Sequence, residues 1–160
     1  MTPDLLSNLP SRIHMILEEG AKEGASRIAF TDEDGAEWSY RRLIDTVADV
    51  AGKMAELGVR PGDRVMVVCE NSIAAIVLMY AASRLDAWSV MTSARLSSRE
   101  IDLIKEDCSP RCVFYTHTIS SEADAHARRH GATLEVFDEI GRVKVGSLDA
   151  GTIAESVESD

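Results

Sequence analysis

The spacing of apolar and polar residues changes along the chain, and each change marks an expected element. Apolar residues recur at intervals of three and four over residues 43–57, as on one face of an amphipathic helix. Ser39 is its expected N-cap, and Gly58 and Pro61 follow its end. Residues 65–69 are instead a short β-branched run that is apolar on both faces. This run predicts a buried strand of a parallel sheet.

Strand and helix patterns then alternate with a repeat of about 23 residues. Ser97 and Glu100 match a capping box at the start of one of the helices. Repeated units of this kind predict an α/β fold whose core is a parallel sheet with right-handed crossovers. The strands are expected to start near residues 64, 87, 111 and 133, and the intervening helices to cover residues 73–85, 98–109 and 121–130.

The amino-terminal part of the chain predicts a helix followed by a hairpin. Residues 9–19 place apolar side chains at helical spacing, and Gly20 is expected to end that helix. Residues 27–31 and 36–38 flank an Asp-Gly pair at 34–35, which supplies the positive φ of a tight turn. We therefore expect a small antiparallel hairpin before the main sheet.

The length of 160 residues suits one domain. We expect an α/β domain over residues 1–138 and an acidic tail or linker over residues 139–160; the stretch from Asp138 to Asp160 carries six acidic and two basic residues. The chain as a whole has 27 acidic and 17 basic residues, and the net charge of −10 argues against nucleic acid and anionic membrane as partners.

The apolar segments, the first residues and the cysteines of the sequence indicate where the protein resides. The longest apolar run, residues 73–82, is too short to span a bilayer, and the first residues do not resemble a signal peptide, so we expect a cytoplasmic protein. Three cysteines argue against a disulfide framework. Cys108 and Cys112 are expected to be buried or half-buried structural thiols.

Common catalytic motifs are missing from the sequence. It has no G-x-G-x-x-G loop, phosphate loop, nucleophile elbow or H-E-x-x-H motif. His126 and His130 are four residues apart on an expected helix and could share a metal, but no third ligand is evident. We favour an exposed helix surface for both histidines. No catalytic residue and no metal ligand is therefore predicted.

Several segments nevertheless resemble one enzyme family. Residues 57–65, Leu-Gly-Val-Arg-Pro-Gly-Asp-Arg-Val, resemble a recurrent segment in the N-terminal region of the adenylate-forming superfamily, the AMP-dependent acyl-CoA synthetases and ligases. The resemblance covers residues 8–137 and is greatest to the fatty-acid-CoA ligases. Further segments match in the family's order and spacing: Trp-Ser-Tyr-Arg-Arg-Leu at 38–43, Asn-Ser at 71–72, Ala-Arg-Leu at 94–96, and the helix from Glu100 to Ser109.

The chain departs from the family pattern in two ways. Glu70 and Asp86 stand where the family usually has Pro and Gly, and Ser93-Ala94 replace Asn-Pro. The family's Ser/Thr/Gly-rich phosphate loop, its later adenylate-binding motifs and its C-terminal lysine are all missing. The resemblance therefore implies an N-terminal part of a ligase that lacks catalytic residues and is inactive alone.

The resemblance implies a two-step reaction in the parent enzyme, with ATP, Mg²⁺ and coenzyme A as cofactors and a small carboxylic acid as substrate. We expect none of these cofactors to bind tightly to the chain alone, whose main partner would be the remainder of the ligase. Arg95 matches an arginine that contacts coenzyme A phosphates in some family members. It is the one site residue that the resemblance assigns, and a guanidinium suits phosphate oxygens because it binds them bidentately.

Two other functions stay open at this point. The chain could be a non-catalytic dimerisation or interaction module, or the N-terminal part of an adenylation domain that loads a carrier protein. We expect the chain to self-associate whether it is a fragment of a ligase or a short natural product. In both cases, apolar surface that the rest of a ligase would cover is exposed. The acyl substrate cannot be read from these residues.

Overall fold

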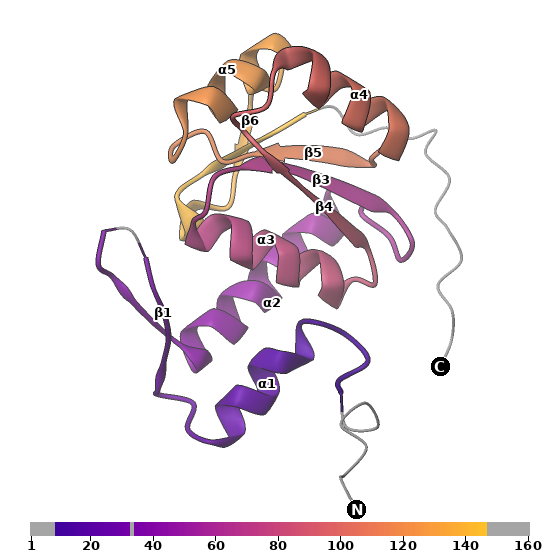
Figure 1. Cartoon of the computed structure of the whole chain (residues 1–160). Coiled ribbons are helices and arrows are strands. Elements are labelled where there is room, and N and C mark those ends of the chain that lie inside the picture. Colours follow the sequence, from indigo (N-terminus) through magenta and orange to yellow (C-terminus); the bar gives the residue numbers. More distant parts are fainter. Residues whose placement is uncertain (1–8, 33, 147–160) are drawn as a thin grey trace, which may run out of the picture.

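The computed structural model describes residues 9–32 and 34–146 (Figure 1). A five-stranded sheet lies between two layers of helices, and a first helix and a two-stranded hairpin lie beyond one of the layers. The strand order is β4-β3-β5-β7-β6. The strands of this sheet are β3 (Arg64–Cys69), β4 (Trp88–Ser93), β5 (Cys112–Tyr115), β6 (Leu134–Val136) and β7 (Val143–Val145).

The expected parallel sheet is confirmed at its centre, where β3 pairs in parallel with β4 and with β5. The far side is different, because β7 is antiparallel to both of its neighbours, β5 and β6. A 3₁₀ turn at Asp138–Ile140 and Gly141, with φ of 86°, reverse the chain between β6 and β7. So short a connection can join only antiparallel strands. The expectation of an all-parallel sheet is therefore wrong for β7 alone, because β6 runs in the same direction as β3, β4 and β5.

The sheet also extends past residue 138, where the sequence suggested that the domain ends. β7 lies between β5 and β6, and the N–H of Gly146 donates to the carbonyl of Val113 at 2.9 Å. Residues 139–146 of the expected tail are thus part of the domain, since their strand completes the sheet. Residues 147–160 lie outside the described part of the chain.

Alternate side chains of β3 pack into two separate cores. Val65 and Val67 face one core together with the buried faces of α2 and α3, whereas Met66 and Val68 face the other with α4 and α5. This alternation explains why the strand is apolar on both faces. The helices are α2 (Tyr40–Glu56), α3 (Ile73–Arg84), α4 (Ser98–Cys108) and α5 (Ser121–Arg129).

Serine side chains cap all four of these helices. Each serine Oγ accepts the backbone N–H of the third residue after it, which satisfies one of the unpaired donors at a helix start. Ser97 and Glu100 form the predicted capping box. The capping residues are Ser39, Ser72, Ser97 and Ser120.

The hairpin is confirmed, whereas the first helix is displaced. Strands β1 (Ile28–Thr31) and β2 (Glu37–Ser39) pair in antiparallel fashion. Helix α1 spans Met15–Lys22 and continues through Gly20, which was expected to end it. A Cβ at residue 20 would overlap the ring of Tyr40. Gly20 therefore allows α1 and α2 to approach closely, so its role is in packing and not in ending the helix.

Candidate functional site

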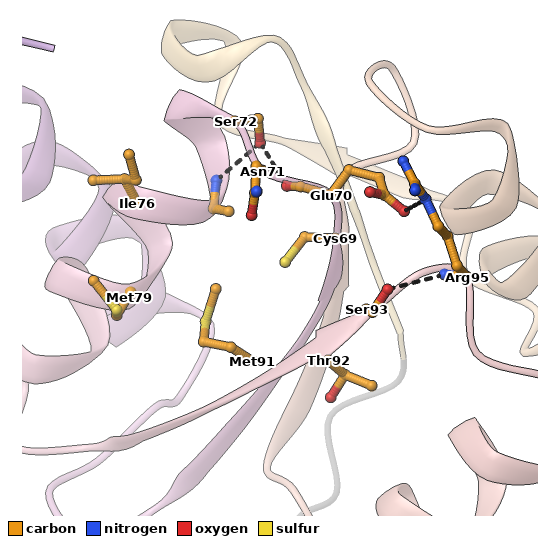
Figure 2. Close-up of a pocket in the computed structure, with 11 residues that line it drawn as sticks. Cys69, Glu70, Asn71, Ser72, Ile76, Met79, Met91, Thr92, Ser93 and Arg95 are labelled. Carbon is orange, nitrogen blue, oxygen red and sulfur yellow. Dashed lines mark hydrogen bonds and ion pairs between the residues drawn. The ribbon is translucent and has the colours of Figure 1, made fainter.

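The carboxyl ends of β3, β4 and β5 meet at one edge of the sheet, where parallel α/β folds bind their ligands. A pocket of about 470 Å³ opens at this edge between α3 and the ends of β3 and β4 (Figure 2). It is the natural place to look for a ligand site. Its lining residues are Cys69, Glu70, Asn71, Ser72, Ala75, Ile76, Met79, Met91, Thr92, Ser93 and Arg95.

One wall of the pocket is apolar and sulfur-rich. Ile76 and Met79 come from α3, Met91 comes from β4, and Cys69 ends β3 (Figure 2). Burial, reinforced by the nearby charge of Glu70, raises the pKa of the Cys69 thiol to about 11. The thiol is therefore protonated at neutral pH and is a poor nucleophile.

The loop after β3 forms the polar rim and begins the next helix. Ser72 Oγ donates to the carbonyl of Glu70 at 3.2 Å and accepts the N–H of Ala75 at 3.3 Å. The Asn71-Ser72 pair, which supported the family resemblance, thus contributes the N-cap of α3. Its hydroxyl is engaged with the backbone, so Ser72 has a structural role here.

Arg95 lies in the loop after β4, beside Glu70 at the polar rim (Figure 2). The N–H of Ala94 donates to the carbonyl of Cys69 at 3.0 Å, which joins this loop to the end of β3. Arg95 Nε donates to Glu70 Oε1 at 3.0 Å, and the Arg95 side chain is 78% exposed. Figure 2 shows this ion pair at the edge of the pocket. The structure therefore places Arg95 at the edge of the sheet where the parallel strands have their carboxyl ends, with its guanidinium open to solvent.

His126 reaches the same loop from α5. Its Nε2 lies 3.1 Å from the carbonyl oxygen of Ala94 and 3.1 Å from that of Leu96. Because both partners are acceptors, Nε2 must carry the hydrogen. No pattern in the sequence indicates this contact, because its partners are about 30 residues apart along the chain. His126 is therefore a member of the site that sequence reasoning missed.

The exposed helix surface expected for His126 and His130 is wrong. His126 is 8% exposed, and the side chain of His130 is 9% exposed. His130 contacts Tyr115 through Nδ1 at 2.5 Å and Asp102 through Nε2 at 2.8 Å, well apart from the partners of His126. The two rings thus serve different contacts. Within residues 9–32 and 34–146, no group of three or more His, Cys, Asp or Glu residues is arranged to hold a metal.

The other two cysteines behave as predicted. Cys108 and Cys112 are buried free thiols. Burial is the main cause of a raised pKa for both, and it lifts that of Cys112 to about 12. Both are structural thiols.

The most recognisable sequence segment, residues 57–65, lies at the opposite edge of the sheet. Asp63 precedes β3 and Arg111 precedes β5; both residues are almost fully buried. Arg111 donates to Asp63 through Nε at 3.0 Å and through Nη2 at 3.3 Å. The N–H of Arg60 donates to the same carboxylate at 2.8 Å. This segment therefore stabilises the fold and does not line the pocket.

Comparisons with known proteins agree with this fold. A model of the AMP-binding enzyme family matches residues 17–158. The long-chain-fatty-acid–CoA ligase FadD13 of Mycobacterium tuberculosis is 31% identical over 99 residues, covering 62% of this chain and 19% of the ligase. The hybrid PKS-NRPS synthetase thnA of Trichoderma harzianum is 26% identical over 121 residues, covering 76% of this chain and 3% of the synthetase.

A solved structure gives the same result. The inhibitor-bound N-terminal domain of FACL13 from Mycobacterium tuberculosis has a TM-score of 0.61 and 25% identity, covering 64% of this chain and 26% of that chain. The chain therefore spans only a small part of these relatives. No helix in the described ranges is both long and apolar enough to cross a bilayer.

Proposed function

The chain belongs to the AMP-binding enzyme family, and we propose that it forms the N-terminal part of a cytoplasmic AMP-forming ligase that joins a carboxylic acid to coenzyme A. The observation that carries the proposal is the family match over residues 17–158, which includes every described strand and helices α2 to α5. The likeness to the N-terminal domain of FACL13 supports the placement of this domain at the start of the enzyme.

The proposed reaction has two steps. A carboxylate oxygen attacks the α-phosphorus of ATP, and the bond from this phosphorus to the oxygen that bridges to the β-phosphate breaks. Pyrophosphate is the leaving group, and an acyl-adenylate is formed. The sulfur of coenzyme A then attacks the acyl carbon, its proton is lost, and AMP leaves with the electrons of the broken acyl–oxygen bond. Both steps concentrate negative charge, so cationic and N–H groups must surround the reacting phosphates.

The residues of this domain fit one part of that task. Arg95 presents an exposed guanidinium at the ligand edge of the sheet, and Glu70 engages only its Nε–H among the described residues. The two terminal nitrogens of Arg95 remain available for phosphate oxygens. We assign Arg95 to a phosphate group of coenzyme A. When bound, coenzyme A supplies the thiol that accepts the acyl group.

ATP and Mg²⁺ have no comparable set of ligands in the described residues, which contain no cluster of metal-binding side chains. We therefore assign their binding to the remainder of the ligase, and we propose that the domain alone is inactive. A fatty acid is the proposed substrate, because FadD13 is a long-chain-fatty-acid–CoA ligase. Loading of a carrier protein is the second candidate, which the similarity to the PKS-NRPS synthetase thnA favours.

Carboxylate-dependent exchange of pyrophosphate into ATP tests the first step. We expect exchange from a ligase that contains this domain with the remaining family motifs, and none from the 160-residue chain. Exchange by the chain alone would reject the proposed inactivity. A ligase that shows exchange but transfers its acyl group to a carrier protein, and not to coenzyme A, would establish the second candidate.

Arg95→Ala tests the second step. In the ligase, we expect a KM for coenzyme A raised about tenfold, the effect of losing one charge-assisted phosphate contact, and an unchanged rate of pyrophosphate exchange. Arg99→Ala is the matched control, because Arg99 is also exposed and is the second residue of α4. An unchanged KM in Arg95→Ala would reject the assignment of Arg95.

A further inference from the structure

We propose that His126 is a positioning residue for Arg95. His126 fixes the backbone on both sides of Arg95. The loop that carries the guanidinium is therefore already ordered before an anionic ligand binds. The inference rests on the proposed phosphate role of Arg95 and adds a second residue, from a different element, on which that role depends.

The loop around Arg95 is held by hydrogen bonds along its whole length. The N–H of Ala94 donates to Cys69, the N–H of Arg95 donates to Ser93 Oγ at 3.3 Å, and the N–H of Leu96 donates to the Ser93 carbonyl at 3.3 Å. Ser97 is fixed by its capping box with Glu100. The donors of this loop are thus satisfied within the loop or by β3.

His126 supplies the partner for the carbonyls. Its single Nε2–H is shared between the oxygens of Ala94 and Leu96, the two residues that flank Arg95. The ring is 8% exposed and Ala94 is 1% exposed, so water cannot readily replace this donor. Loss of the donor would leave a buried carbonyl unsatisfied, and the loop would have to rearrange to expose it.

The geometry connects this hydrogen bond to binding. The long Arg95 side chain is the solvent-facing group of an otherwise fixed loop, and the ion pair with Glu70 restrains it from the β3 side. When a phosphate binds Arg95, only the arginine side chain loses conformational freedom, because the loop backbone is already fixed. Preorganisation of this kind raises affinity because less conformational entropy is lost on binding.

His126→Gln and His126→Asn test whether the hydrogen bond itself matters, because both replace histidine by a polar amide side chain but only Gln is long enough to reach the loop. Gln can place an N–H near the position of Nε2, whereas Asn is one methylene shorter and falls short of the loop. His130→Gln is the matched control, because His130 lies on the same helix end but contacts Asp102 and Tyr115. Thermal unfolding of each variant separates global stability from local effects.

The first measurement is amide hydrogen exchange of Ala94, Arg95 and Leu96 in the 160-residue chain. We expect His126→Asn to raise exchange at these amides by about fivefold or more relative to the rest of the sheet, the factor that one hydrogen bond of ordinary net strength represents. His126→Gln and His130→Gln should exchange like the wild type at this loop. Equal exchange in the Asn and Gln variants would overturn the proposed hydrogen bond.

The second measurement follows the Arg95 Nε–H signal by NMR while millimolar coenzyme A is added. We expect a shift in the wild type and in His126→Gln, and a shift reduced about fivefold at equal ligand in His126→Asn. A wild-type shift that His126→Asn leaves unchanged would overturn the positioning role even if the loop loosens. If the wild-type signal does not move, the phosphate role of Arg95 fails and the positioning role fails with it, whereas the exchange data still report whether His126 holds the loop.

Discussion

The pair of Asp63 and Arg111 shows how single residues anchor this fold. Asp63 is completely buried and accepts hydrogen bonds from Arg111 and from the backbone of Arg60. We expect Asp63→Ala to lower the free energy of unfolding by about 3–5 kcal/mol, because it removes a fully buried carboxylate that accepts hydrogen bonds from the buried guanidinium of Arg111.

Urea unfolding of the purified chain measures this effect. Arg60→Ala is the control. It removes only an exposed side chain, and the backbone N–H of residue 60 can still donate to Asp63. We expect a loss below about 1 kcal/mol for that variant. Equal losses in the two variants would contradict the importance assigned to the buried pair.

Asp86 illustrates how a departure from the family pattern is accommodated. The residue has a φ of 54°, in the left-handed region that glycine adopts most easily. Aspartate tolerates this region better than most residues, and its carboxylate also accepts a hydrogen bond from Arg12 Nε at 2.6 Å. The usual glycine of the family therefore has a conformational explanation, and Asp86 meets the same requirement with an added ion pair.

At the scale of elements, the capping box of α4 predicts a local dependence on pH. The side-chain and backbone hydrogen bonds from Ser97 hold the pKa of Glu100 below its ordinary value near 4.5. A lowered pKa in the folded state means that the stabilisation is complete above the unfolded value and is lost as the pH falls through the folded value. The protection of the first amides of α4, which is the intrinsic exchange rate divided by their measured rate at the same pH, should therefore decrease on acidification. Glu100→Gln should remove this dependence, whereas Glu106→Gln, which lies outside the cap, should keep it.

Strand β7 gives a prediction about the domain boundary. Ile140, Val143 and Val145 are buried in the core beside β5 and β6. A chain that ends at residue 138 lacks all three, and we expect it to lose about 4 kcal/mol or more of unfolding free energy. A chain that ends at residue 146 retains the complete sheet and should unfold near the wild-type temperature. Equal melting temperatures for the two truncations, measured by circular dichroism, would contradict the assignment of β7 to the domain.

The sequence predicted the elements that depend on local patterns. Serine caps, the Asp-Gly hairpin and the apolar run of β3 each have a short-range physical cause, and the structure contains all of them. Local patterns could not show that β7 inserts beside β5, because Val143–Val145 is too short for a clear periodicity. For the same reason His126 was not recognised, since its partners are distant in sequence and close only in the fold.

At the scale of the whole molecule, the five-stranded sheet of the described residues has edge strands β4 and β6, and they are protected unequally. The edge strand β6 has three residues, and its Glu135 lies 3.0 Å from His117 Nε2 and forms an ion pair with Arg142. The opposite edge strand β4 has six residues and no charge, and it exposes 60% of Trp88 and 40% of Met91. Charged residues and short lengths are the usual protection of an edge against pairing with another chain. Strand β4 lacks both.

We therefore expect the 160-residue chain to self-associate through β4. Light scattering combined with size-exclusion chromatography should give an average mass that rises with protein concentration. Met91→Lys should shift this rise to higher concentration, because a charge on an edge strand disfavours pairing with a second copy. Leu103→Lys is the control, since Leu103 is 53% exposed but lies on α4, away from the edge. A monomeric mass at every concentration would contradict the expected association, and equal effects of the two lysines would show that it depends on general surface apolarity and not on the unprotected strand.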